Sequence, residues 1–492
     1  MSAELSAGTN PRLTVVVLAA GGGTRMRSKT MKVLHPIAGR SMIGHVLAAA
    51  RATGPERIVA VVGHQREQVA AHIQEIEPDA VLAVQEEQLG TGHAVRMAVE
   101  AAGSIEGTVL VAYGDTPLLE GESLRSFAAE HEAAQCAVSI LSGIVDDPFG
   151  YGRVLRNAEG DVEAIVEEKD ATAAQREVRE INSGILALDA DFLLGALPRI
   201  GNDNAKGEYY LTDVVAIARE DGLTVGAYPI ADVMQTEGVN DRAQLARMGA
   251  EMNRRIVDRW MREGVTVMDP ATTWIDAGVT LEPDVTILPG VQLLGATAVA
   301  EDAVVGPDCT LKDCEIGSGA RVVRTHGELA VVGAGANVGP FSYMRPGTTL
   351  GAGGKIGGFV ETKNATIGEG AKVPHLSYVG DAEIGEGTNI GAGTIFANYD
   401  GVRKHRTTVG RQARTASNNT FVAPVTIGDG AGTGAGTVVR EDVPPGALAV
   451  SSGPQRNIEG WALRKRAGTA QAEAAEAALG TRPAGEQDVA ES

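Results

Sequence analysis

An aliphatic residue recurs at every sixth position through most of the C-terminal half of the chain. An α-helix repeats a face about every 3.6 residues and a strand every second residue, so neither produces this interval. A six-residue repeat with Gly, Asp or Asn at its corners is typical of a parallel β-helix, whose coils stack one aliphatic side chain per side. We therefore predict a left-handed parallel β-helix of hexapeptide repeats over residues 266–458. The repeating residues are Leu281, Ile287, Leu293, Val299, Val305, Leu311, Val332, Val338, Met344, Leu350, Ile356, Ile367, Val373, Val379, Ile384, Ile390 and Phe396.

Interruptions of this repeat predict loops. The repeat changes phase around Gly327–Leu329 and pauses between Phe396 and Val409, where residues 397–405 intervene. Loops extruded from otherwise regular coils explain both interruptions. The aromatic content of 4% fits a narrow interior that takes mainly Ile, Val, Leu, Ala and Thr.

The N-terminal half has a different pattern. The apolar runs Leu13–Ala20, Arg57–Val62 and Thr108–Tyr113 alternate with Ala-rich stretches such as Ile43–Arg51. Continuous apolar runs are typical of strands that are buried on both faces of a parallel sheet. The alternation therefore predicts βαβ units and a Rossmann-like, doubly wound α/β domain over residues 12–240.

A connecting helix and the chain ends complete the predicted organisation. Over residues 241–265, apolar residues lie three or four apart with charges between them, which predicts an amphipathic linker helix. Residues 1–11 form an N-terminal extension. Residues 459–492 form an Ala/Glu-rich tail without a hydrophobic face, for which we expect disorder.

Charge and cysteine content limit the partners of the protein. The 63 acidic and 43 basic residues give a net charge of −20, which repels nucleic-acid phosphates and anionic lipid. The N-terminus lacks the features of a signal peptide, and no apolar stretch has the length of a membrane span. The three cysteines form no CxxC pair and are expected to be reduced and buried. We expect a cytoplasmic protein with no nucleic-acid or membrane partner.

A glycine-rich turn follows the first predicted strand. Gly21, Gly22 and Gly23 precede Arg25, and Lys32 lies a little further on. Such a turn exposes backbone N–H groups to phosphates, while the basic side chains supply charge. The turn matches neither GxGxxG nor the P-loop, so by itself it is equally compatible with a plain tight turn.

The surrounding motif, Leu18–Met26 with its downstream lysine, resembles the signature of the sugar-1-phosphate nucleotidyltransferases. Further motifs follow in the order found in the N-acetylglucosamine-1-phosphate uridylyltransferases, and together they cover nearly the whole N-terminal half. These motifs are Gln85–Ala94, Tyr113–Pro117, Gly150–Arg153, Ile165–Asp170, Ile181–Gly184, Gly207–Asp213 and Glu237–Asn240.

The resemblance implies transfer of UMP from UTP to a sugar phosphate, with Arg25 and Lys32 as catalytic residues. It implies Mg²⁺ as cofactor, held by Asp115 and Asn240, whose oxygens suit that ion. Gln85 with Gly90 and Thr91 would recognise uracil, and Gly152, Glu167 and Asn182 would hold the sugar. The full set of implied nucleotide- and sugar-binding residues is Leu18, Ala19, Ala20, Gly21, Gly22, Lys32, Gln85, Gly90, Thr91, Tyr113, Gly114, Gly152, Glu167, Asn182 and Asn240.

Motifs in the predicted β-helix resemble the acetyltransferase half of a bifunctional enzyme of the same family. They are Pro340–Gly347, Gly358–Asn364, His375–Asp381, Asn389–Thr394 and Ala397–Gly401. Acetylation of glucosamine-1-phosphate needs a base, because its amine arrives largely as an ammonium that cannot attack a thioester. A histidine accepts a proton near neutral pH, so His375 is the candidate general base.

The resemblance also implies the binding residues of this second site. Glucosamine-1-phosphate would contact Arg345, Lys363, Tyr378 and Asn389, with the first two as charge-assisted donors to its phosphate. Acetyl-CoA would contact Ala392, Asn398, Tyr399, Ser417, Ala435 and Arg440. The family implies a homotrimer that shares residues across its interfaces, and UDP-N-acetylglucosamine as the final product. One segment, Arg414–Thr420, departs from the Gly-Ser-Asp run usual in the family, which bears on the geometry of the coenzyme A site.

Other protein classes share parts of this pattern. In ADP-glucose pyrophosphorylases a β-helix serves regulation or assembly, but Lys363, His375 and Tyr378 favour a second reaction here. Non-catalytic subunits of translation-factor exchange complexes would have lost the metal and phosphate residues, whereas Lys32 and Asp115 are present.

Overall fold

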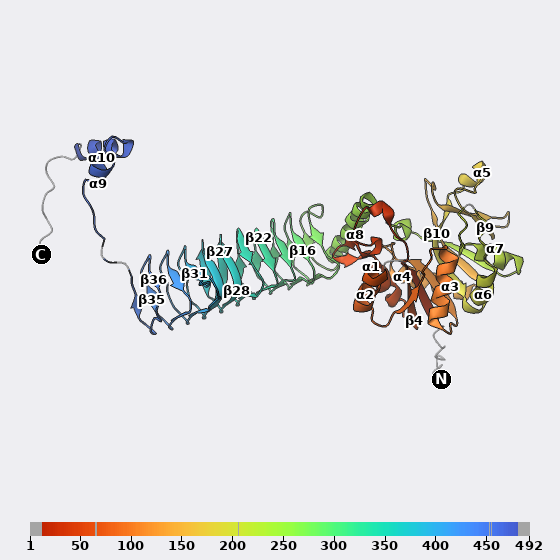
Figure 1. Ribbon diagram of the computed structural model, residues 1–492, viewed down its shortest axis with the longest axis horizontal. Helices are drawn as coiled ribbons and strands as arrows, with labels where there is room; N and C mark the ends of the chain where they lie inside the picture. Colours follow the sequence, from red (N-terminus) through yellow and green to blue (C-terminus); the bar gives the residue numbers. More distant parts are fainter. Residues whose placement is uncertain (1–11, 64–65, 205, 452, 454, 481–492) are drawn as a thin grey trace.

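The computed structural model describes residues 12–63, 66–204, 206–451, 453 and 455–480. An α/β unit lies at one end of an elongated β-helix, and helices α9 and α10 lie beyond its other end (Figure 1). The predicted extension at residues 1–11 and the last part of the tail, 481–492, lie outside the described residues.

A mixed sheet forms the centre of the N-terminal unit. Its strand order is β11-β7-β10-β6-β1-β4-β5, with a β8–β9 hairpin paired to β10. The three apolar runs chosen from the sequence are strands β1, β6 and β4, which lie side by side and parallel, so this prediction is confirmed. The strands are β1 (Leu13–Leu18), β4 (Arg57–Val62), β5 (Val81–Val84), β6 (Thr108–Tyr113), β7 (Val138–Ile144), β8 (Gly152–Arg156), β9 (Val162–Val166), β10 (Glu180–Asp189) and β11 (Val225–Pro229).

Helices cover both faces of this sheet, as a doubly wound fold requires. Val15 and Val17 of β1 pack in the core formed with α1, α2 and α4, whereas Val16 and Leu18 pack in the core formed with α3, α6 and α7. Strand β10 runs antiparallel to both β6 and β7, which the alternating pattern did not indicate. The helices are α1 (Met42–Ala52), α2 (Arg66–Ile76), α3 (Thr91–Ala102), α4 (Gly121–Ala133), α5 (Ala173–Arg176), α6 (Ala190–Ala196) and α7 (Asp213–Glu220).

The C-terminal half is the predicted left-handed β-helix. Its short strands run from β12 (Thr266–Val267) to β37 (Leu448–Ala449), and along one face they pair in parallel in the order β12-β15-β18-β21-β24-β27-β29. In the first coils each strand pairs with the third strand after it, so Ile287 lies against Val305 one coil later. All of the repeating aliphatic residues are buried, which confirms the six-residue pattern. The strands of this face are β15 (Thr286–Ile287), β18 (Val304–Val305), β21 (Arg321–Val322), β24 (Asn337–Val338), β27 (Lys355–Gly358) and β29 (Lys372–His375).

Helix α8 (Arg242–Arg262) joins the two units. Ile256, Val257 and Trp260 of this helix belong to the hydrophobic core of the β-helix. The buried Asn253 donates to the carbonyl of Thr273 at 2.8 Å and accepts from the N–H of Ile275 at 2.9 Å. Its amide therefore pairs with two backbone groups of the first coil of the β-helix. The second half of α8 is therefore packed as part of the β-helix, whereas Met248 in its first half packs against the N-terminal unit.

The tail differs from its prediction. Helices α9 (Trp461–Lys465) and α10 (Ala470–Gly480) occupy residues that we expected to be disordered. Alanine and glutamate are strong helix formers, so a segment without a hydrophobic face can still be helical. The buried Ala472 lies in α10, which contacts α9. The expectation of disorder is wrong for these residues.

Two further expectations concern cysteines and membranes. Cys136, Cys309 and Cys314 are buried free thiols, as predicted. Among the helices of the described residues, none combines the length and the apolar character that a membrane crossing needs.

The inward and outward positions of the β-helix predict opposite effects of neighbouring substitutions. Leu293 is fully buried and Gln292, its neighbour in β16 (Gln292–Leu294), is exposed. Truncation of a buried leucine leaves a cavity, so Leu293→Ala should lower the free energy of unfolding of the β-helix by about 2–5 kcal/mol. Gln292→Ala should change it by less than about 0.5 kcal/mol. Urea unfolding followed by circular dichroism measures both, and equal effects would contradict the assignment of inward positions.

Candidate active sites

The glycine-rich turn connects β1 to the 3₁₀ helix η1 (Thr24–Met26). The residues on either side of η1 have a left-handed backbone conformation: φ is 60° at Gly23 and 47° at Arg27. A side chain at Gly23 would place its Cβ 2.5 Å from the Cβ of Lys32. Glycine is therefore required here, because the turn must pass directly against the lysine that follows it.

Oxygens from separate segments converge on the ammonium of Lys32. Its Nζ donates to Oδ2 of Asp115 and lies 3.4 Å from Oδ1 of Asn240. The side chains of Lys32 and Asp115 are only 13% and 17% exposed. Asp115 follows strand β6, and its carbonyl accepts from the N–H of Val239, which places Asn240 beside it. This cluster is a half-buried position for a cation between a carboxylate and an amide oxygen.

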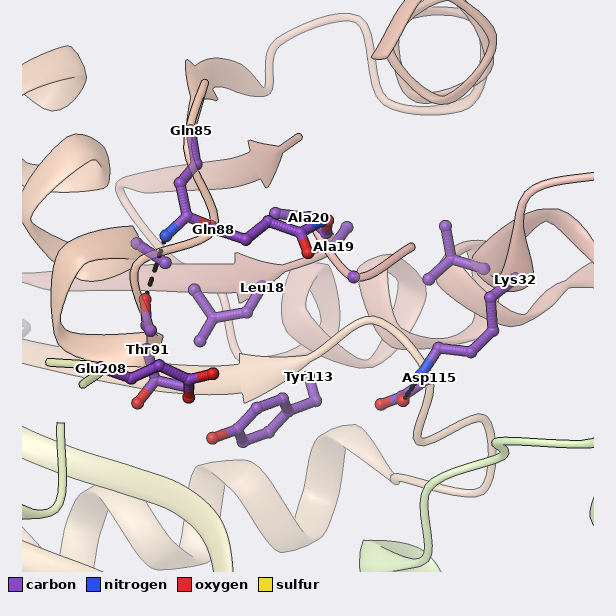
Figure 2. Close-up of a pocket in the computed structure, with 14 residues that line it drawn as sticks. Leu18, Ala19, Ala20, Lys32, Gln85, Gln88, Thr91, Tyr113, Asp115 and Glu208 are labelled. Atoms are coloured by element: carbon purple, nitrogen blue, oxygen red, sulfur yellow. Dashed lines mark hydrogen bonds and ion pairs between the residues drawn. The ribbon is translucent and has the colours of Figure 1, made fainter. Parts of the chain in front are cut away.

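A cavity of about 250 Å³ lies beside this cluster at the carboxyl ends of β1 and β6. Figure 2 shows Lys32 and Asp115 at one end of it and Gln85 toward the other, with the ring of Tyr113 near its floor. The predicted residues that line it are Leu18, Ala19, Ala20, Gly21, Lys32, Gln85, Gly90, Thr91, Tyr113 and Asp115.

The Gln85 end of the cavity has a fixed amide orientation. Nε2 of Gln85 donates to the carbonyl of Gly90 at 3.0 Å and lies 3.1 Å from Nδ1 of His93. A carbonyl only accepts hydrogen bonds, so the NH₂ group must face Gly90. The amide oxygen of Gln85 therefore remains as the acceptor available to a ligand.

Backbone hydrogen bonds join the Gly90 turn to a distant segment. The N–H of Gly92 donates to Tyr209, and the N–H of Leu211 donates to Oγ1 of Thr91 at 2.9 Å. Gly90 has φ of 107°, and a Cβ there would lie 2.6 Å from the carbonyl oxygen of Tyr209. Glycine permits this close approach, which holds the 208–211 segment against the cavity.

A neighbouring cavity of about 460 Å³ adjoins the first along Thr91, Tyr113 and Glu208. Glu167 and Asn182, both predicted to hold the sugar, line it. Burial raises the pKa of the Glu167 carboxyl above its ordinary value, although the charge of Lys206 acts in the opposite direction. The residues predicted to bind the nucleotide and those predicted to hold the sugar thus line adjoining cavities.

Some predicted residues do not line either cavity. Arg25 is exposed on η1, and Gly22, Gly114, Gly152 and Asn240 lie next to lining residues. Gln88, Glu208 and Lys206 also line the cavities, although the sequence motifs did not single out their side chains. The Gly207–Asp213 motif gave a signal for Glu208, but the direction of its side chain depends on the contacts of Tyr209 with the Gly90 turn.

The second group of predicted residues lies on successive coils of the β-helix. Lys363 lies on β28 (Glu361–Ile367) and Tyr378 on β30 (Tyr378–Ile384), which pair in parallel. Arg345 follows β25 (Ser342–Met344), and its guanidinium contacts Glu361 at 2.9 Å. Their neighbouring coils bring these residues to one face.

A loop from the next coil brings a further cation to this face. The loop follows β31 (Ile395–Ala397) and turns at Asp400, whose Oδ1 accepts from the N–H groups of Val402 and Arg403. It places Lys404 against Lys363, and the ammonium of Lys404 lowers the pKa of Lys363. Sequence reasoning missed Lys404, because the six-residue repeat is absent in this loop.

Asp381 and Asn398 connect this face internally. Asn398 donates to Oδ2 of Asp381 at 2.5 Å, and its Nδ2 lies 3.5 Å from the hydroxyl of Tyr378. Burial raises the pKa of Asp381, but hydrogen bonds from Asn364 and Asn398 and the charge of Lys404 outweigh it and lower that pKa. A carboxylate thus stays ionised beside the lysines.

The remaining predicted residues lie on the same part of the rod. His375 ends β29 with an exposed side chain, and Asn389 forms a bridge with Lys372 of the same strand. The N–H of Asn418 donates to the carbonyl of Ala392, and that of Gly436 to the carbonyl of Ser417, so these coil corners stack. Ala435, Tyr399 and Arg440 are exposed. Among the described residues, no hydrogen bond joins the His375 imidazole to the lysine pair.

The atypical segment after Arg414 still completes a regular coil. Asn418 adopts φ of 58°, a left-handed conformation that Asn tolerates better than most residues. The fully buried Asn419 donates to the carbonyls of Gly434, at 2.9 Å, and Ser417. Its amide therefore satisfies the backbone inside the coil, and Ser417 remains at the exposed corner.

Comparisons with known proteins agree with both halves. Residues 15–179 match the family model of the MobA-like NTP transferase domain. The bifunctional protein GlmU of Kineococcus radiotolerans is 60% identical over 465 residues, covering 94% of each chain. Those of Streptomyces avermitilis, at 59% identity over 96% of this chain and 98% of the relative, and Pseudarthrobacter chlorophenolicus, at 57% over 94% and 95%, are similar over the same extent.

These matches and the fold define a class of enzyme in which a nucleotidyltransferase unit precedes an acyltransferase β-helix. The chain belongs to the GlmU family of bifunctional proteins. It N-acetylates glucosamine-1-phosphate with acetyl-CoA and transfers UMP from UTP to N-acetylglucosamine-1-phosphate, giving UDP-N-acetylglucosamine and pyrophosphate. Two alternatives are therefore excluded: an enzyme that carries out nucleotidyl transfer alone, and a non-catalytic subunit. The family implies small-molecule substrates and a divalent metal.

The raised pKa of Glu167 predicts a stability that depends on pH. The unfolded chain releases this proton near pH 4.3, whereas the folded protein releases it at a higher pH. Between these values the folded state holds a proton that the unfolded state lacks, so the contribution of Glu167 to stability falls as pH rises through the window. Glu167→Gln removes this penalty. Its thermal midpoint should exceed that of the natural protein at pH 7 by more than at pH 4, and a difference independent of pH would contradict the burial effect.

Proposed function

We propose that the cavity beside Lys32 is the site of uridylyl transfer and that Arg25 and Lys32 act on the UTP phosphates. The observation that carries this proposal is the convergence of Asp115 and Asn240 on the Lys32 ammonium at one end of a cavity. Nucleotidyl transfer requires the attacking phosphate oxygen to lie in line with the α-phosphate and the negative charge to be neutralised. The Lys32 ammonium supplies positive charge for the phosphates, and the exposed N–H groups of the glycine-rich turn position them.

The metal of this site is Mg²⁺ in our proposal, held by Asp115 and Asn240. The fit rests on the Lys32 ammonium, a cation that both oxygens already face. Among the described residues no cluster of three or more His, Cys, Asp or Glu residues suits a metal, and Mg²⁺ is usually bound by few protein groups together with phosphates and waters. When bound, the ion neutralises phosphate charge and supports the departure of pyrophosphate.

The remaining cavity residues select the two substrates. The free amide oxygen of Gln85 accepts from a donor N–H such as that of the uracil imide, and His93 holds the amide in this orientation. In the adjoining cavity, the carboxylate of Glu167 accepts hydrogen bonds from sugar hydroxyls, and the amide of Asn182 is the partner of the acetamido group. Asn182 already accepts from the N–H of Gly184 at 2.9 Å, which fixes the direction of its amide.

For acetyl transfer we assign His375 as the general base and Arg345, Lys363 and Lys404 as the cradle of the sugar phosphate. Two ammonium groups side by side are stabilised by an anion between them, and a phosphate supplies that charge. Tyr378 and Asn389 complete the sugar site. The coil corners at Ala392, Ser417 and Ala435, with Asn398, Tyr399 and Arg440, would hold acetyl-CoA.

The assembly and organisation follow from these assignments. Domains of uridylyl transfer at 12–240, a linker at 241–265 and acetyl transfer at 266–458 account for both reactions. His375 and Tyr399 are exposed in a single chain, so partner subunits in a homotrimer would enclose the acetyl-transfer site. The soluble substrates of both reactions favour the cytoplasm as the location.

Separate substitutions should remove the two reactions independently. His375→Ala removes the base and should lower thiol release from acetyl-CoA by about a hundredfold or more, while pyrophosphate release from supplied N-acetylglucosamine-1-phosphate persists. Asp115→Ala should do the reverse. Assays of both products on each purified variant test this. Loss of both signals in either variant, or of neither, would refute the two-site assignment.

Lys404 gives a sharper test of the phosphate cradle. Lys404→Met removes a charge-assisted hydrogen bond worth about 1.5–3 kcal/mol, so KM for glucosamine-1-phosphate should rise about tenfold or more. Arg403→Met changes the neighbouring charge on the same loop and is the matched control. Steady-state acetyl-transfer kinetics measure both variants. An equal rise in KM in both variants would show that the phosphate responds only to the overall positive charge of the loop and not to a contact with Lys404.

A further inference from the structure

The guanidinium of Arg242 reaches from helix α8 to the glycine-rich turn. Arg242 is the first residue of α8, and its Nε donates to the carbonyl of Met26 at 3.1 Å. Met26 is buried, 1% exposed, and ends η1 directly after Arg25. The contact therefore restrains the part of the turn that carries a proposed phosphate ligand.

The turn needs such a restraint because its backbone is unusual. Arg27 adopts a left-handed conformation with φ of 47°, which is unfavourable for a residue with a side chain and persists only where the surroundings impose it. The Arg242 contact immediately precedes this residue. Without the guanidinium, the Met26 carbonyl would lose a charge-assisted donor next to the strained position.

The start of α8 also fixes Asn240. Oε1 of Gln244 accepts from the N–H of Asn240 at 2.7 Å, while Oδ1 of Asp241 accepts from the N–H of Gln244 at 2.8 Å. This reciprocal cap sets the backbone of the proposed metal ligand. One helix end thus holds both the turn and Asn240.

The other end of α8 is packed into the β-helix, which makes the support rigid. Asn253 bonds the first coil, and Trp260 lies in its core. The hairpin after Lys32 is tied to the same coil, because the N–H of Ala277 donates to the carbonyl of Ala38 at 2.9 Å. The C-terminal end of the turn and the hairpin that follows it therefore both contact elements anchored in the C-terminal unit.

The environment of Arg242 agrees with a positioning role. Burial lowers the pKa of His35, and the charge of Arg242 acts in the same direction, which places the guanidinium near this imidazole. Arg242 also lines a cavity of about 560 Å³ between the hairpin after Lys32, helix α8 and the first coils of the β-helix. It does not line the cavity assigned to the nucleotide, so it acts through the turn.

We propose that Arg242 is a positioning residue for uridylyl transfer, which holds the phosphate-binding turn in its active conformation from a helix anchored in the β-helix. The inference rests on the proposed role of the turn in binding the UTP phosphates. It assigns to the C-terminal unit a part in the first reaction site that is separate from acetyl transfer.

The test uses the full-length protein with Arg242→Met, which keeps the length of the side chain but removes its donors. We expect kcat/KM for UTP to fall about tenfold to a hundredfold, with weaker UTP binding in calorimetry and unchanged acetyl transfer. Arg242→Lys, which restores a donor and a charge, should recover part of the loss. Arg262→Met is the control, because this arginine lies on the same helix and, among the described residues, its ion pair is with Asp258 one turn earlier, at 3.0 Å.

Each other outcome overturns the inference. Unchanged uridylyl transfer in Arg242→Met would show that the turn needs no support from α8. A parallel loss of both activities with a lower thermal midpoint would show a general role in folding. Arg25→Gln distinguishes failure of the proposed turn from failure of the positioning role. If this variant leaves UTP kinetics unchanged, the proposed role of the turn fails. A loss in Arg25→Gln with none in Arg242→Met refutes the positioning role alone.

Discussion

Stacking of one aliphatic side chain above the next inside the β-helix is the constraint on which the rest of this protein depends. Because each coil buries its inward residues against the coils on either side, the path of the backbone is fixed along the whole rod. The corners and outer faces are then free to carry side chains that contribute nothing to the core. Lys363, Tyr378 and His375 lie on such outward positions. Helix α8 enters the same core, so this stacking also fixes the direction in which the α/β unit is joined.

The proposed nucleotide site depends on a different constraint, which is the convergence of strand ends. Strands β1 and β6 are adjacent and parallel, so the residues that follow them meet at one edge of the sheet. The N–H of Gly114 donates to the carbonyl of Leu18 there, which brings the glycine-rich turn and Asp115 together. Lys32 and Asn240 then reach this edge from segments far apart in the chain. The site thus assembles from short contributions that the sheet places in register.

The sequence predicted those features that depend on local periodicity. The inward residues of the β-helix, the three parallel strands and the linker helix all follow from spacing, because burial selects the same residue type at each equivalent position. Features that depend on contacts between distant segments did not follow. The antiparallel direction of β10, the approach of Lys404 to Lys363 and the place of Glu208 each depend on a turn whose neighbours the spacing does not show. The helices of the tail were missed because the expectation relied on the lack of a hydrophobic face.

The length of the rod has a consequence for the intermediate of the two reactions. The coils from β12 to β24 lie between the α/β unit and the residues assigned to acetyl transfer (Figure 1). With the two sites placed as we propose, N-acetylglucosamine-1-phosphate made on the distal coils has to leave into bulk solvent and diffuse back to the nucleotide cavity. In this arrangement it is a free metabolite between the two steps, open to dilution and to capture by any other enzyme that recognises it. The covalent fusion keeps the two catalytic units in equal numbers but does not channel the intermediate from one site to the other.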